Sequence, residues 1–171
     1  MKVRSLNHVG LTVSSFKNSV RWYHKMFGLS LVSDQVIDRV QAAKLYNLYG
    51  LGEVDIKLGF LKVPGGGVIE IFEFSPAAAV QKFCWNRPGP THFTMDVKDI
   101  TRWYNKLKHN HVEILCEPQN TNGTEWFFMK DPDGNLIELI DLKTNYHILK
   151  FLGSIVGWAM ARGKYKKYYE D

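Results

Sequence analysis

Residues 6–13, Leu-Asn-His-Val-Gly-Leu-Thr-Val, alternate between polar and apolar side chains as a half-buried strand does. Ser15 then offers a helix N-cap, and an apolar stripe with helical spacing follows it. The same pattern returns at residues 91–97, which again precede a capped helical stripe. When His8 is aligned with His92, the sequence shows an internal repeat with an offset of 84 residues.

The two copies also end alike, each with a strand that contains one acid. Glu70 lies within residues 68–72, and Glu138 lies within residues 136–140. Turn residues rich in Gly, Pro and Asp precede both strands, which suits hairpin connections. Each copy therefore predicts a strand, a helix and three strands, so we expect an α+β fold of two tandem βαβββ modules.

We expect the modules to span about residues 5–74 and 91–143, within one domain of residues 1–143. A Pro-containing linker at residues 75–90 joins them. A helical and basic tail at residues 144–171 follows the domain.

The copies differ in length, mainly because the first has extra residues at 35–52. Within this insertion, residues 40–46 are predicted as a short helix. This helix either walls one side of a cleft or fills a packing role, and the sequence does not decide between the two. In the second copy a strand is predicted at residues 112–116.

Composition narrows the classes of protein to be considered. The chain has 171 residues, of which 45% are hydrophobic, so it can bury a sizeable core. The net charge of +5 is not gathered into one stripe, and no nucleic acid is expected as a partner. The N-terminus has no apolar run typical of a signal peptide, so a cytoplasmic location is expected.

Four side chains occupy corresponding positions on the first and last strands of the two copies: His8, Glu70, His92 and Glu138. Imidazole nitrogen with carboxylate oxygen suits a divalent ion such as Ni, Zn, Co, Mn or Fe and leaves positions open for water or substrate. A lone strand His or Glu is usually solvated or hydrogen-bonded. A Glu flanked by apolar residues, however, is costly to bury unless it is paired or metal-bound, and this occurs in both copies.

Other acids compete for a place in this site. Glu73 lies three residues after Glu70, so strand alternation places it on the opposite face, and the match with Glu138 selects Glu70. Glu53 and Asp55 are weaker candidates for a second acid facing the cleft.

At these residues the sequence resembles the vicinal oxygen chelate superfamily, which includes glyoxalase I, methylmalonyl-CoA epimerase, extradiol dioxygenases, and the fosfomycin and bleomycin resistance proteins. The resemblance covers about residues 5–142. It is most specific in residues 131–139, Asp-Pro-Asp-Gly-Asn-Leu-Ile-Glu-Leu. It implies paired βαβββ modules whose curved mixed sheets enclose a metal-binding cleft.

The resemblance further implies one divalent ion held by His8, Glu70, His92 and Glu138. The expected activity is that of a lactoylglutathione lyase-like enzyme, or an epimerase or isomerase, which stabilises an enediolate of a small oxygenated substrate. Glu138 or Glu70 would then act as both ligand and base. An Fe(II) extradiol-type dioxygenase is one alternative, and a ligand-sequestering protein of the bleomycin-resistance type is another. A homodimer is expected.

The tail lies outside this resemblance. A helix is predicted from Thr144 or Asn145 to about Gly163, followed by a basic and aromatic end. We expect its apolar face to pack on the body or on a second subunit, and a membrane is not expected as a partner. Attachment to a membrane surface, through the apolar face and the basic flank, is the alternative.

Overall fold

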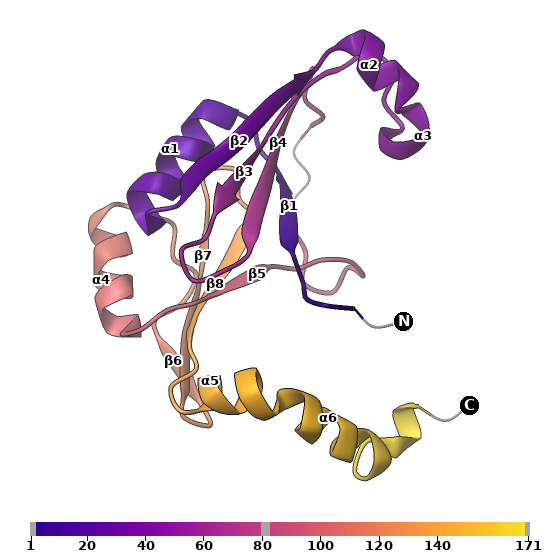
Figure 1. Ribbon diagram of the computed structural model, residues 1–171. Helices are drawn as coiled ribbons and strands as arrows, with labels where there is room; N and C mark the ends of the chain where they lie inside the picture. The colour runs from indigo at the N-terminus through magenta and orange to yellow at the C-terminus, as the bar shows by residue number, and fades with distance from the viewer. Residues whose placement is uncertain (1–2, 80–82, 170–171) are drawn as a thin grey trace. The chain divides into compact units, whose positions relative to one another are not determined.

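The computed structural model describes residues 3–79 and 83–169, and Figure 1 shows its elements in chain order. The chain divides into two compact units. One comprises Met1–Phe93 with Lys130–Asn135, and the other comprises Thr94–Met129 with Leu136–Asp171. The α+β fold with two four-stranded mixed sheets agrees with the tandem modules that the repeat predicts.

The first sheet has the strand order β1-β4-β3-β2. The parallel pairing of β1 with β4 brings the first and last strands of the module together, whereas β3 is antiparallel to both β2 and β4. The bounds of its strands are β1 His8–Thr12, β2 Ser30–Ile37, β3 Asp55–Lys62 and β4 Val68–Ser75.

Helix α1, Phe16–Phe27, packs on one face of this sheet. Ser15 caps its start by accepting a hydrogen bond from the Asn18 N–H, and Gly28 ends it with φ 71, a left-handed conformation that glycine adopts without strain. The helix approaches the sheet closely at Gly59, where an added Cβ would lie 2.7 Å from Phe16 Cζ. The N-cap predicted at Ser15 is thus confirmed.

Two short helices, α2 Arg39–Lys44 and α3 Tyr46–Tyr49, form the insertion of the first module. They confirm the helix predicted at residues 40–46. The buried Ala42 of α2 belongs to an apolar cluster with the side chains of β3 and β4 that point away from α1. The other members of this cluster are Val54, Ile56 and Leu58, with Ile37, Tyr49, Phe60, Phe72 and Phe74 packed against them.

The second sheet has the strand order β5-β8-β7-β6, which repeats the order of the first. Helix α4, Ile100–His109, is capped by Asp99, the counterpart of Ser15 in the repeat. The buried side chains of this module are Ile100 and Leu107 of α4 with Phe127 and Met129 of β7 and Ile137 and Leu139 of β8. The bounds of the strands are β5 Phe93–Asp96, β6 Gln119–Thr121, β7 Thr124–Lys130 and β8 Leu136–Asp141.

The strand predicted at residues 112–116 is wrong. In this segment only Ile114 forms a β-bridge, to Met129 of β7, and the regular strand β6 begins later. Pro118, which has no N–H to donate to a ladder, separates the bridge from β6. The apolar residues of the segment suggested a strand, but the backbone pairs with its neighbour at a single point.

The tail forms a nearly continuous helical run, as predicted, but with a π-helical turn in its middle. It consists of α5 Asn145–His147, the π-helical turn η1 Ile148–Leu152, α6 Gly153–Arg162 and the short 3-10 helix η2 Lys166–Tyr168. Gly163 is the C-cap residue of α6, close to the predicted end. A helix long and apolar enough to cross a membrane does not occur in the described part of the chain.

Candidate metal centre

The pairing of β1 with β4 positions the first two predicted ligands, His8 and Glu70. The register sets Gly10 opposite Glu70, and strand alternation places both His8 and Glu70 on the face of the sheet opposite α1. His8 Nε2 lies 3.3 Å from Glu70 Oε2, and the side chains are 45% and 16% exposed. The structure therefore brings these two residues together at an accessible position.

Asn7 orients the His8 ring. Its Oδ1 lies 3.0 Å from His8 Nδ1, and because an amide oxygen can only accept a hydrogen bond, this contact suits the tautomer that has its proton on Nδ1. In the neutral ring, Nε2 then presents a lone pair toward Glu70, which is the arrangement that a metal ligand requires.

The second module repeats this arrangement at His92. Thr91 Oγ1 lies 2.9 Å from His92 Nδ1, so the side chain just before each histidine holds the same ring nitrogen. The ring of Trp85 also lies against His92, with 6.0 Å between ring centroids. Two independent contacts thus restrict the rotation of this imidazole.

Glu138 is held by a residue of the neighbouring strand. Thr94 Oγ1 donates a hydrogen bond of 2.7 Å to Glu138 Oε2. Thr94 occupies the position that corresponds to Gly10 in the repeat, which has no side chain to offer Glu70. Thr94 therefore gives Glu138 a hydroxyl contact that Gly10 cannot give Glu70.

The competing acids serve other contacts. Glu73 Oε2 accepts a hydrogen bond from the Phe16 N–H at the start of α1, which confirms that it lies on the helix-covered face. The Asp55 carboxylate accepts two hydrogen bonds from Arg39, one from its backbone N–H and one from its Nε, at 3.1 Å each. Glu73 and Asp55 therefore help to hold helices in place, and Glu53 is exposed.

The structure brings together His8 and Glu70, while Glu138 belongs to the other unit. Within residues 3–79 and 83–169, no three His, Cys, Asp or Glu side chains gather into a group that could hold a metal ion. The set of four ligands accordingly stays a prediction.

Sequence reasoning missed Asn7, Thr91 and Thr94, which position the predicted ligands. A signal for the first two was present, since a polar side chain able to bond an imidazole directly precedes both His8 and His92. Thr94 had no such signal, because its contact with Glu138 depends on how β5 and β8 are paired.

The turn before β8 is a structural element rather than part of the ligand set. Tyr23 Oη, which is buried, donates a 2.9 Å hydrogen bond to Asp131 Oδ2, and Asn135 donates to the same carboxylate from its backbone N–H and its Nδ2. Burial raises the pKa of Asp131, and these hydrogen bonds only partly offset it. The most specific run of the sequence thus anchors the turn to α1.

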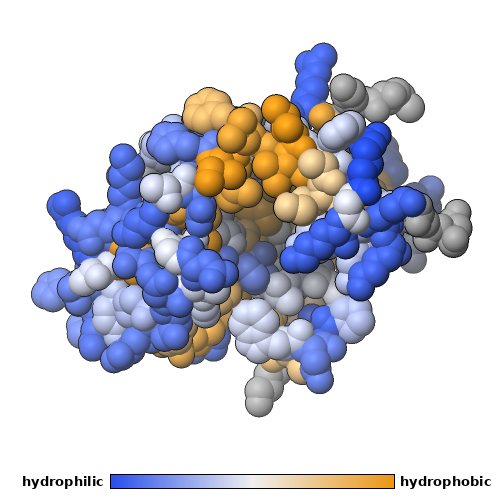
Figure 2. Space-filling view, turned by 90° about the horizontal axis from the view of Figure 1, so that it is seen from below, coloured by the Kyte–Doolittle hydropathy of each residue, from blue (hydrophilic) through white to orange (hydrophobic). Residues whose placement is uncertain are grey.

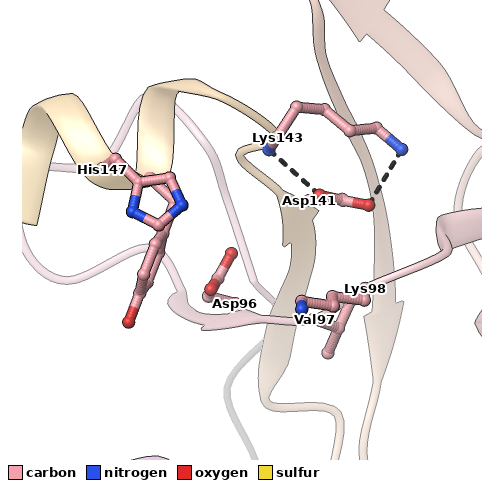
Figure 3. A pocket seen from close by; sticks show the side chains of 7 residues that line it. Asp96, Val97, Lys98, Asp141, Lys143 and His147 are labelled. Atoms are coloured by element: carbon pink, nitrogen blue, oxygen red, sulfur yellow. Dashed lines mark hydrogen bonds and ion pairs between the residues drawn. The ribbon is translucent and has the colours of Figure 1, made fainter.

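A pocket of about 380 Å³ lies in the second unit and is shown in Figure 3. Burial raises the pKa of Asp96, which lines it. Burial also acts to raise the pKa of Asp141, but hydrogen bonds from Lys143 and Asp99 outweigh this effect and lower it below its usual value. The lining residues are Asp96, Val97, Lys98, Asp141, Lys143, Tyr146 and His147, and none of them is a predicted ligand.

The sequence matches the model of the Glyoxalase/Bleomycin resistance protein/Dioxygenase superfamily over residues 5–139. The chain therefore belongs to this superfamily, as the resemblance in residues 5–142 predicts. The name of the superfamily covers enzymes and drug-resistance proteins, so membership does not by itself assign a reaction. No curated protein matches the sequence.

Solved structures agree on the fold. A glyoxalase family protein from Bacillus cereus superposes with a TM-score of 0.69 at 20% identity, covering 82% of this chain and 95% of that one. The trypanothione-dependent glyoxalase I of Leishmania major gives 0.63 at 18% identity, with coverages of 89% and 99%. TioX from Micromonospora sp. ML1 gives 0.54 at 18% identity, with coverages of 81% and 98%.

Proposed function

We propose that this protein is a divalent-metal-dependent enzyme of the glyoxalase type that moves a proton on a small oxygenated substrate, as a lyase, isomerase or epimerase does. His8 and Glu70 from the first module and His92 and Glu138 from the second would hold the ion, which could be Ni, Zn, Co, Mn or Fe. The observation that carries the proposal is the pair of His8 and Glu70, oriented by Asn7 on the face of the first sheet opposite α1.

The donor atoms of this pair suit a metal ion. Nitrogen and oxygen ligands held about 2.0–2.2 Å from one ion lie roughly 3–3.5 Å apart, and His8 Nε2 and Glu70 Oε2 are 3.3 Å apart. The Asn7 contact favours the tautomer with the proton on Nδ1, which leaves Nε2 for coordination. A protonated His8 would also pair with Glu70 at this distance, and the experiment below separates the two cases.

A bound divalent ion supplies Lewis acidity to two adjacent substrate oxygens, which acidifies the neighbouring C–H. The proton then needs a carboxylate within hydrogen-bond reach, and Glu70 and Glu138 are the candidates. Thr94 donates to Glu138 Oε2 and holds that carboxylate in one orientation. Glu70 lies opposite Gly10 of β1, which has no side-chain hydroxyl to donate to it. The Glu70 carboxylate contacts the imidazole of His8.

The surroundings of Glu70 indicate an apolar group on the substrate. Phe60 pairs directly with Glu70 across β3 and β4, and Phe72 lies two residues along β4 on the same face. Phe72 stacks on Phe74 with 6.0 Å between ring centroids. We therefore expect aromatic oxoaldehyde adducts to be better substrates than those with only a methyl group.

Metal content tests the proposal. Elemental analysis of the purified and reconstituted protein should find about one divalent ion per chain, and His8→Ala and Glu138→Ala should both lose it. Glu53→Ala, which removes an exposed acid outside the ligand set, is the matched control and should retain the ion. If the wild-type protein takes up no metal on reconstitution, the pair of His8 and Glu70 is only an ion pair and the proposal fails.

The reaction is tested with the loaded protein. Thiol adducts of methylglyoxal and phenylglyoxal should exchange the relevant C–H for deuterium in D₂O, and the phenyl adduct should react faster. Oxygen consumption with catechols would instead identify a dioxygenase. Tight ligand binding that chelator does not change, with no turnover, would identify a sequestering protein.

A further inference from the structure

The segment of residues 145–169, here called the tail, leaves large apolar side chains exposed. Phe151 and Ile155 are each 66% exposed, and Trp158 is 60% exposed. The tail is tied to the second sheet at its start, where Asn145 Nδ2 donates a 3.2 Å hydrogen bond to Thr124 Oγ1. Further exposed apolar residues of the tail are Ile148, Leu149, Leu152, Val156, Met160, Tyr165, Tyr168 and Tyr169.

The tail is basic. Residues 145–169 contain no Asp or Glu, and their basic residues are Lys150, Arg162, Lys164, Lys166 and Lys167, while the acids Glu170 and Asp171 follow them in the sequence. These charges accompany aromatic rings: the Arg162 guanidinium lies 4.3 Å from the centroid of Trp158, and Lys167 Nζ lies 5.0 Å from that of Tyr168. Rings with a polar edge beside cations are the side chains enriched at the interface between a bilayer and water.

We propose that the tail binds the surface of an anionic lipid bilayer. Its apolar side chains would enter the boundary between headgroups and acyl chains, while its lysines and arginine contact the negative headgroups. The helical run of residues 145–162 is about 27 Å long, short of the roughly 30 Å of a hydrocarbon core, and it contains Lys150, so the tail would lie on the membrane surface.

Charge complementarity distinguishes this partner from a second copy of the chain. Residues 1–144 contain 17 basic and 15 acidic side chains, so a second subunit offers no net negative charge to the tail. A nucleic acid would satisfy the charge but would leave Ile148, Leu152 and Ile155 in water. An anionic membrane meets both the apolar and the basic side chains.

Figure 2, which views the molecule from below, shows apolar side chains gathered in a surface patch with hydrophilic side chains along its border. Such a juxtaposition is typical of membrane-surface helices, in which the apolar area and the flanking cations act together. Phe151, Ile155 and Trp158 are exposed in the single chain, so the membrane is to be distinguished from a second subunit as the surface that covers them.

Cosedimentation of the full chain with vesicles tests the proposal. At low salt the protein should bind vesicles of phosphatidylcholine mixed with phosphatidylglycerol. It should bind much more weakly to vesicles of phosphatidylcholine alone, and binding to the mixed vesicles should weaken at high salt. A triple variant, Lys164→Gln with Lys166→Gln and Lys167→Gln, should bind at least tenfold more weakly, since each surface lysine contributes about fivefold. Circular dichroism confirms that each variant folds.

The apolar contribution is tested by Phe151→Ser with Ile155→Ser, which should also weaken vesicle binding at least tenfold. Leu48→Ser on α3, where Leu48 is 71% exposed, is the matched control and should bind as the wild type does. Equal binding to neutral and anionic vesicles, or no binding to either, overturns the proposal. So does a dimer in light scattering that the Phe151→Ser, Ile155→Ser variant converts to monomers, because the tail would then be a subunit interface.

Discussion

Each of the two predicted histidine ligands is held through its Nδ1 atom by the side chain that precedes it. Asn7 holds His8 at 3.0 Å, and Thr91 holds His92 at 2.9 Å. Because these partners are adjacent in the chain, the orientation of each imidazole depends little on the rest of the fold. Contacts of this kind usually strengthen a metal site by setting the tautomer and the ring plane.

Asn7→Ala should therefore weaken metal binding about tenfold or more, because His8 Nδ1 loses its acceptor and Nε2 is no longer the only basic nitrogen. The measurement is the dissociation constant for Zn²⁺ or Co²⁺ by competition with a chromophoric chelator. Asn47→Ala, on the exposed part of α3, is the control. Equal affinities in wild type and Asn7→Ala would show that Asn7 does not position the ligand.

Thr94 should matter through its hydroxyl rather than through its shape. Thr94→Val removes the 2.7 Å hydrogen bond to Glu138 at nearly constant volume, so metal affinity should fall, whereas Thr94→Ser should restore it. The same chelator competition measures both variants. If Thr94→Val and Thr94→Ser behave alike, the contact has no positioning role.

At the site, the repeat predicted the strands that carry His8, Glu70 and Glu138, whereas His92 lies just before β5. Periodicity placed Glu70 and Glu73 on opposite faces, and the structure confirms it, because Glu73 accepts from the Phe16 N–H. Pattern alone could not assign Thr94 to Glu138, since that contact depends on the pairing of distant strands.

At the level of elements, local signals predicted helices better than strands. Ser15 and Asp99 each accept a hydrogen bond from an N–H three residues later, as the cap residues predict. By contrast, the strand predicted at residues 112–116 depends on a partner, and only Ile114 finds one. Helix caps are satisfied within a few residues of chain, whereas strands are stabilised by pairing across it.

The contact between α1 and the turn before β8 should stabilise the protein measurably. Tyr23→Phe removes the buried hydrogen bond to Asp131 and should lower the free energy of unfolding by about 1.5–3 kcal/mol, the range for bonds to charged groups. Urea titration near neutral pH measures this loss. Tyr46→Phe, at an exposed position on α3, should have almost no effect.

The same contact predicts a pH dependence. Burial, followed by the charge of Asp131, raises the pKa of Tyr23 well above its usual value. The folded protein therefore keeps this proton while the unfolded chain loses it near pH 10, and stability falls as pH rises above that point, by about 1.4 kcal/mol per pH unit for this group. In urea titrations between pH 8 and pH 11, the free energy of unfolding should decline less steeply for Tyr23→Phe than for the wild type. Parallel declines would contradict the buried, protonated phenol.

At the level of the whole molecule, the boundary between the units does not follow the boundary between the repeats. Residues 130–135 belong to the first unit although they lie in the second module. Asp133 accepts a 3.0 Å hydrogen bond from the Ser14 N–H and contacts Ser19 Oγ at 3.5 Å. The first unit is therefore completed by a segment from late in the chain.

Asp133→Ala should accordingly increase backbone hydrogen exchange at the start of α1, more than a hundred residues away in sequence, while α4 stays protected. Hydrogen exchange with mass spectrometry measures both helices in one experiment. Glu117→Ala, an exposed acid before β6, should leave both unchanged. Increased exchange confined to residues around position 133 would show that the turn does not support α1.

The inclusion of residues 130–135 in the first unit also constrains how the protein folds during its synthesis. Tyr23 leaves the ribosome 108 positions before Asp131, which at about 5–20 residues per second is roughly 5–20 seconds of translation. During that interval the hydroxyl of Tyr23 has only water to bind, and α1 has no turn to dock against. The first unit therefore reaches its final core only after much of the second module has been synthesised, and a nascent chain halted before that point still lacks the partner of its most buried tyrosine.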